Sequence, residues 1–128
     1  MAKRVILVDD SKTILATAEM ALEEMVASGV VEIKTYVNPA ELLELLQSGQ
    51  ENYDLLISDI NMPQLNGLDL ARTLKADANF KNKPLLILTT ESSAEMKAMG
   101  KEIGVTGWLV KPFSDTKLIK ALNMVLGL

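Results

Sequence analysis

The chain has 128 residues and a formal net charge of −4, and it contains neither cysteine nor histidine. This length fits one domain, expected over residues 1–128, that buries a core of its own. The missing residue types exclude disulfides, zinc thiolate centres and any mechanism that needs an imidazole from this chain. The negative charge disfavours nucleic-acid binding, which depends on clustered lysine and arginine.

Neither a signal peptide nor a membrane span is visible in the sequence. The N-terminal apolar run is short and is soon interrupted by Asp9 and Asp10. No other run approaches the length needed to cross a bilayer. We therefore expect a cytoplasmic protein.

Short apolar runs that alternate with helical patterns predict an α/β fold. In chain order, strands are expected at Val5–Val8, Val31–Thr35, Leu55–Ile57, Leu85–Leu88 and Trp108–Val110. Four of these runs are continuously apolar, which is typical of parallel strands buried on both faces. The polar alternation from Val31 to Thr35 instead indicates an edge strand.

Apolar residues at helical spacing predict a helix after each strand. The five apolar faces consist of Ile14, Leu15, Ala18, Leu22 and Met25; Leu42, Leu45 and Leu46; Leu68, Ala71 and Leu74; Met96, Met99 and Ile103; and Leu118, Leu122 and Val125. Asn38 before Pro39, Ser92 before Glu95, and Ser114 are expected to cap three of these helices.

Reactive side chains lie where four of the strands end. Asp9 and Asp10 follow the first strand, Asp59 the third, Thr89 the fourth and Lys111 the fifth. The carboxyl ends of parallel strands line one edge of an open sheet, and ligands bind in the crevice there. We therefore expect three carboxylates, a hydroxyl and an ammonium group to converge on one site.

A cluster of carboxylates needs a counter-charge. Two carboxylates about 4 Å apart repel each other by roughly 4 kcal/mol at an effective dielectric of about 20. A hard divalent cation offsets this repulsion, and oxygen ligands without histidine suit Mg2+. A single aspartate in such a place is more often a helix cap, as Asp10 could be. The whole set nevertheless favours a Mg2+ site at Asp9, Asp10 and Asp59.

A carboxylate can also act as a nucleophile and form an acyl phosphate. Asp59 stands alone after the middle strand, whereas Asp9 and Asp10 are paired and suit cation binding. We expect Asp59 to accept a phosphoryl group and Lys111 to neutralise one phosphoryl oxygen. Pro112 holds the backbone of Lys111 extended, which favours an aimed side chain over a solvated one.

Four segments together resemble the receiver domains of two-component response regulators, over essentially the whole chain. They are Val8-Asp9-Asp10-Ser11, Ser58–Pro63 with Asn66-Gly67, Leu88–Glu91 and Val110–Phe113. The resemblance implies a flavodoxin-like fold: a doubly wound, five-stranded parallel sheet in the order 2-1-3-4-5 with five helices.

The resemblance implies roles for the site residues. Asp59 is the phosphoacceptor, and Asp9 and Asp10 hold Mg2+ together with the backbone carbonyl of Asn61. Asn61 and Glu91 occupy positions that border the attacking water and tune the lifetime of the phosphoryl group. The chain is thus expected to lose its phosphoryl group by autodephosphorylation and not to act as an enzyme on other substrates.

A conformational switch is implied as well. Thr89 is the hydroxyl that moves to bond the phosphoryl group, and Trp108 is the aromatic residue that rotates inward with it. This movement couples Asp59 to the face formed by the fourth helix, fifth strand and fifth helix. Lys111 is the family's invariant lysine, and its bond to Pro112 is expected to be cis.

The expected phosphoryl donor is a histidine kinase. The last helix ends with the chain, so we expect the output to be a protein contact made by a monomer. The motifs are most similar to single-domain chemotaxis regulators, which suggests a messenger from a chemotaxis kinase to the flagellar motor switch. A phosphate sink, a phosphorelay intermediate and an excised receiver of a larger regulator remain alternatives.

Two other classes fit the residues less well. A haloacid dehalogenase-type hydrolase needs Asp-x-Asp-x-Thr after the first strand, whereas Asp9 and Asp10 are adjacent. A flavin-binding module needs a Ser/Thr/Gly-rich loop whose N–H groups bind phosphate. Asp9 and Asp10 would repel a phosphate at that place.

Overall fold

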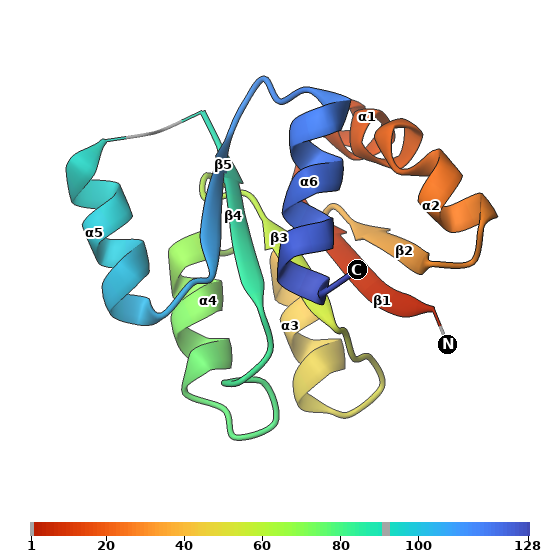
Figure 1. Ribbon diagram of the computed structural model, residues 1–128. Helices are drawn as coiled ribbons and strands as arrows, with labels where there is room; N and C mark the ends of the chain where they lie inside the picture. Colours follow the sequence, from red (N-terminus) through yellow and green to blue (C-terminus); the bar gives the residue numbers. More distant parts are fainter. Residues whose placement is uncertain (1, 91–92) are drawn as a thin grey trace.

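The apolar runs form one parallel sheet in the computed structural model, which describes residues 2–90 and 93–128 (Figure 1). The strands are β1 (Lys3–Val8), β2 (Val31–Tyr36), β3 (Leu55–Ser58), β4 (Leu85–Thr89) and β5 (Gly107–Val110). Their order is β2-β1-β3-β4-β5, and all neighbours are parallel. The predicted fold class and strand order are therefore confirmed.

Helices follow the strands and cover both faces of the sheet. They are α1 (Lys12–Ala21), α2 (Glu23–Ala27), α3 (Pro39–Gln47), α4 (Gly67–Lys75), α5 (Ala94–Ile103) and α6 (Asp115–Leu126). The first predicted helix is divided at Leu22, which ends α1 and precedes α2. Leu22 is fully buried, so the apolar face continues across the break. No helix in the described part of the chain is long and apolar enough to cross a membrane.

Polar side chains fix the helix starts. Asn38 and Ser114 cap α3 and α6, as predicted. The prediction of Ser92 as the cap of α5 is wrong, because the Ser93 hydroxyl accepts the backbone N–H of Met96. Ser92 itself lies outside the described residues. With serine at both positions, sequence spacing alone does not determine where the helix begins.

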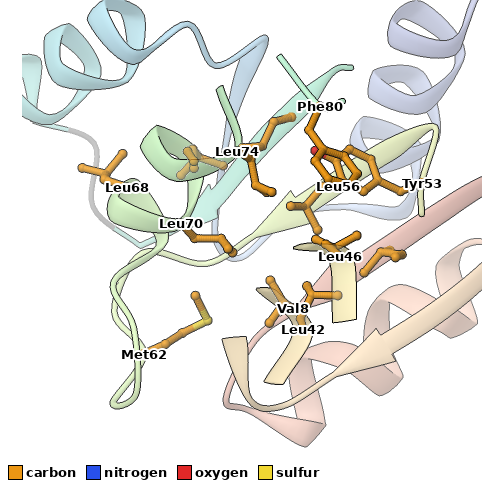
Figure 2. Packing of buried hydrophobic residues seen from close by; sticks show 14 of the residues in the cluster. Val8, Leu42, Leu46, Tyr53, Leu56, Met62, Leu68, Leu70, Leu74 and Phe80 are labelled. Carbon is orange, nitrogen blue, oxygen red and sulfur yellow. The ribbon is translucent and has the colours of Figure 1, made fainter. Parts of the chain in front are cut away.

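The sheet separates two apolar cores. One core packs strand residues such as Ile6, Val8, Leu56, Leu85 and Ile87 against α3, α4 and part of α5. The other packs strand residues such as Val5, Leu7, Leu55, Ile57, Leu86 and Leu88 against α1, α2 and α6. Alternate side chains of a strand point to opposite faces, which explains this division. Figure 2 shows the first core, in which the rings of Tyr53 and Phe80 stack at 5.5 Å.

The sequence predicted the edge position of one edge strand correctly but predicted too much burial for the other. The edge position of β2 is confirmed. The expectation that Trp108–Val110 is buried on both faces is wrong, because β5 is the other edge strand. Its residues are half-buried, and Val110 is 41% exposed. An edge strand has one strand neighbour instead of two, so its side chains are less covered.

A buried carboxylate joins β1 and β2 to the segment after α3. Glu51 contacts Arg4 and Tyr36, and its Oε2 lies 3.1 Å from Nζ of Lys34. Burial alone would raise the pKa of Glu51. Hydrogen bonds from Tyr36, the backbone N–H of Asn52, Lys34 and Arg4 nevertheless lower this pKa to about 2. The cluster therefore keeps Glu51 ionised at neutral pH.

Candidate functional site

Three carboxylates meet at the carboxyl edge of the sheet, on the side where α1 and α6 begin (top of Figure 1). Asp9 and Asp10 follow β1, and Asp59 follows β3. One carboxylate oxygen of each residue lies within 4.8 Å of the others. Asp9 and Asp59 are 2% and 7% exposed, whereas Asp10 is open to solvent. The predicted convergence of the three acids is confirmed.

The local backbone fixes the two buried acids. The N–H groups of Asp9 and Asp59 each donate to a carbonyl of the neighbouring strand, at 3.1 Å. Oδ1 of Asp9 accepts the N–H of Ser11 at 2.9 Å, and Oδ1 of Asp59 accepts the N–H of Ile60 at 2.8 Å. The cap of α1 is Ser11 and not Asp10. The carboxylate of Asp10 therefore belongs to the acidic cluster, and the helix-cap interpretation of this residue is wrong.

Lys111 brings a positive charge to the cluster. Its Nζ lies 2.7 Å from Oδ2 of Asp9 and 3.5 Å from Oδ2 of Asp59, and its side chain is only 11% exposed. The backbone N–H of Lys111 donates to the carbonyl of Thr89 at 2.8 Å, which ties the lysine to β4. Its bond to Pro112 is cis, as the resemblance implied. One ammonium group against three carboxylates leaves the cluster with an excess of negative charge.

This excess of negative charge acts on the buried carboxyl group of Asp59. Burial raises the pKa of Asp59, and the neighbouring Asp9 carboxylate raises it further. Lys111 and the N–H of Ile60 act in the opposite direction but do not cancel these effects. Ionised Asp59 is thus held in an unfavourable environment that a hard cation would relieve. The donors are all oxygen atoms, which fits Mg2+.

The other predicted site residues are distributed around this cluster. Thr89 is fully buried at the end of β4, and Asn61 lies exposed two residues after Asp59. Trp108 lies in β5, half-buried, and packs against the core that contains α3 and α4. Glu91 lies outside the described residues, so its predicted place beside the site stays a prediction.

Sequence reasoning missed how Gly67 holds the loop after Asp59. A Cβ at Gly67 would lie 1.8 Å from the carbonyl oxygen of Asp59, so no other residue fits. The N–H of Gly67 also donates to the carbonyl of Ile60 at 2.8 Å. Asn66, which caps α4, was visible in the sequence as a helix-start signal. The close approach of the glycine depends on the folded loop and has no such signal.

Comparison with known proteins agrees with this geometry. The family model described as "Response regulator receiver domain" matches residues 5–123. The chain belongs to the response regulator receiver family. A receiver domain is a phosphoryl acceptor and not a classical enzyme, and receiver domains act with histidine kinases. Asp9, Asp10 and Asp59 form the acidic cluster typical of a receiver Mg2+ site.

Among known receivers, this chain is similar to several chemotaxis proteins. It is 32% identical to chemotaxis protein CheY1 of Helicobacter pylori (strain ATCC 700392 / 26695) over 124 residues, 97% of each chain. It is 32% identical to chemotaxis protein CheY of Pseudomonas aeruginosa over 122 residues, 95% of this chain and 94% of that one. The solved structure of chemotaxis response regulator CheY4 of Vibrio cholerae has a TM-score of 0.83 and 36% identity, covering 98% and 99% of the two chains.

Proposed function

We propose that this receiver, one domain over residues 1–128, accepts a phosphoryl group on Asp59 from a histidine kinase in the cytoplasm and then loses it to water. The observation that carries this proposal is the meeting of the carboxylates of Asp9, Asp10 and Asp59 with the ammonium group of Lys111. In the transfer, a carboxylate oxygen of Asp59 attacks phosphorus as the bond from phosphorus to the donor imidazole breaks.

The charged residues divide the tasks of this reaction, and Asp59 has two of them, as nucleophile and as a residue that would hold Mg2+. Asp9, Asp10 and Asp59, with the backbone carbonyl of Asn61, are the residues that would hold Mg2+. Bound Mg2+ supplies positive charge that offsets the repulsion between Asp59 and the phosphoryl oxygens. Lys111 binds one phosphoryl oxygen, for which its place 3.5 Å from Asp59 is suited.

Loss of the phosphoryl group needs a water molecule on the open side of the site. The exposed side chain of Asn61, two residues after Asp59, is suited to border that water. We assign Asn61 and Glu91 to tuning the lifetime of the phosphoryl group. The protein returns to its resting state after each transfer and releases phosphate, so it acts on no other substrate.

The switch consists of Thr89 and Trp108. Ile87 and Trp108 are partners in the register of β4 and β5 and belong to the same core. Thr89 lies two residues after Ile87, so its side chain points to the same face of the sheet as the ring of Trp108. A movement of the Thr89 hydroxyl toward a phosphoryl group on Asp59 opens space on the side of the sheet where Trp108 lies. This shared face supports the coupling.

The proposed output is a phosphorylation-dependent contact of the monomer with the flagellar motor switch, through the face formed by α5, β5 and α6. The similarity to chemotaxis proteins over nearly the whole chain supports this role. The net charge of −4 argues against a nucleic-acid partner. Added negative charge on Asp59 would bias the existing switch and need not build a new fold.

The test is a titration with the N-terminal peptide of the flagellar switch protein. The emission of Trp108, the single tryptophan, is followed with and without beryllofluoride and Mg2+, which together imitate the phosphoryl group. Tighter binding by the activated wild type, and not by Asp59→Asn, is expected. An emission response without peptide binding would mean that the protein signals to another partner, such as another protein of a phosphorelay. No response of either kind would overturn Asp59 as the phosphoacceptor.

A further inference from the structure

Helix α5 has a glycine where an apolar side chain is expected. Met96, Gly100 and Ile103 share the face that points to the sheet, at the spacing of a buried helix stripe. The prediction of Met99 on this face is wrong, because Met99 is 37% exposed. Gly100 is the buried residue of this helix. Glycine is the least favoured residue in a helix interior apart from proline, so its presence there calls for a specific cause.

The ring of Trp108 is that cause. A Cβ on Gly100 would lie 2.8 Å from Cζ3 and 3.3 Å from Cε3 of Trp108. It would also lie 3.1 Å from Cγ2 of Val105. Carbon atoms in a packed interior prefer 3.5–4.0 Å. The six-membered ring of the indole therefore rests directly on the backbone of α5, in space that any other residue at Gly100 would occupy.

A methyl group added at Gly100 would force a neighbour to move, because it would lie 2.8 Å from Cζ3 of Trp108. Trp108 is held by β5, whose register with β4 is fixed through Ile87, and its benzo ring has no rotatable bond of its own. Either the whole ring turns away from α5, or α5 moves away from the sheet. Both changes alter the surface that α5 and β5 share.

We propose that Gly100 is a positioning residue for Trp108: the absence of a side chain at Gly100 lets α5 hold the ring in its resting place. Its consequence for signalling rests on the proposed function, because there the movement of Trp108 carries the signal from Asp59. A ring already displaced from this place has less movement left for activation to produce. Gly100 and Trp108 thus form a matched pair, in which the small residue allows the large one.

The first experiment examines the resting protein without any activator. Gly100→Ala should shift the emission of Trp108 to longer wavelength and increase its quenching by acrylamide, because the ring becomes more exposed. Lys101→Ala, at the next and exposed position of α5, is the matched control and should change neither. Emission and quenching of Gly100→Ala equal to those of the wild type would overturn the proposal.

The second experiment compares the effect of Gly100→Ala on stability in two backgrounds, in which we expect opposite signs. Alanine is a better helix former than glycine, so Gly100→Ala should raise the urea midpoint wherever no clash opposes it. We expect this increase in the Trp108→Phe background, whose smaller ring leaves room, and a lower midpoint in the wild-type background. An equal increase in both backgrounds, or loss of folding in both, would overturn the proposal. Loss of folding that Trp108→Phe restores supports it.

The third experiment separates this proposal from the proposed function. Beryllofluoride with Mg2+ should change the Trp108 emission of the wild type more than that of Gly100→Ala. An equal response of the two proteins would overturn the effect of Gly100 on signalling. A wild type that does not respond would refute the switch at Asp59 and Trp108. The place of the ring on Gly100 would still be decided by the two experiments on the resting protein.

Discussion

Nζ of Lys111 lies 2.7 Å from Oδ2 of Asp9 but 3.5 Å from Oδ2 of Asp59. In the resting protein the lysine therefore neutralises one of the residues proposed to bind the metal more closely than it neutralises the proposed phosphoacceptor. Lysine and a divalent cation are alternative counter-charges for Asp9. We expect them to compete.

The first prediction concerns this competition. Lys111→Met keeps the length of the side chain and removes its charge, so Mg2+ should bind about tenfold more tightly because a nearby positive charge no longer repels it. Phosphorylation by a small-molecule donor should become roughly 100-fold slower, because a phosphoryl oxygen loses its partner. Calorimetric titration with Mg2+ measures the first effect, and Lys117→Met, on the exposed side of α6, is the control. Unchanged or weaker Mg2+ binding would contradict the competition.

The second prediction follows from the raised pKa of Asp59. When folding raises the pKa of an acid, the folded protein becomes less stable as the pH rises from the pKa of the unfolded state to that of the folded state. For aspartate the pKa of the unfolded state is about 3.9. Asp59→Asn should therefore stabilise the protein at neutral pH in a chelating buffer, and the gain should shrink as the pH falls toward 3.9. Added Mg2+ should reduce the gain, because it favours the ionised wild type. Urea midpoints measure this, with exposed Glu19→Gln on α1 as the control.

The third prediction concerns two glycines that are needed for different reasons. Gly67→Ala should destabilise the protein by about 3 kcal/mol or more, because the new Cβ would meet the carbonyl of Asp59 at 1.8 Å. Gly49→Ala meets nothing within 4 Å, but its φ of +81° is unfavourable for alanine and should cost about 1 kcal/mol. Denaturant unfolding measures both values. Equal costs at the two positions would mean that the loop after Asp59 relaxes away from Gly67.

The fourth prediction concerns Glu51, which is not a member of the acidic cluster of Asp9, Asp10 and Asp59. Its pKa is lowered to about 2 in the folded protein, so its contribution is present above the unfolded pKa of about 4.3 and is lost as the pH falls toward 2. The stability difference between wild type and Glu51→Gln should be on the order of 3 kcal/mol near neutral pH. It should fall toward zero at low pH. Exposed Glu44→Gln is the comparison. A difference that does not depend on pH would exclude an ionic origin.

Much of the fold and the meeting of the acids could be predicted because they follow from local patterns. The apolar runs determine the strands. Parallel strands bring Asp9, Asp59 and Lys111 to one edge of the sheet, and this does not depend on the details of packing. The position of β5 as a half-exposed edge could not be predicted from its run alone. Trp108–Val110 is as apolar as a buried strand, and only the strand order reveals its place.

Features that arise only when separate segments pack together could not be predicted from the sequence. The break at Leu22 leaves the apolar spacing of the helix intact, so nothing in the pattern marks it. The closeness of Gly67 to Asp59 and of Gly100 to Trp108 arises only when separate elements pack together. Each glycine is visible in the sequence, but its neighbour is not.

The sheet separates two cores, and this separation has a consequence for which residues determine binding strength and which determine switching. Trp108 and α5 belong to one core, whereas α6 belongs to the other. A partner on the face formed by α5, β5 and α6 therefore wraps around an edge strand and touches both layers. The layer under α6 does not contain the ring of Trp108. In the proposed function, contacts there would therefore add affinity whether or not Asp59 carries a phosphoryl group. Contacts on α5, which packs against Trp108, would supply the proposed dependence on phosphorylation. Natural variation can thus tune basal affinity and signal amplitude through separate sets of residues.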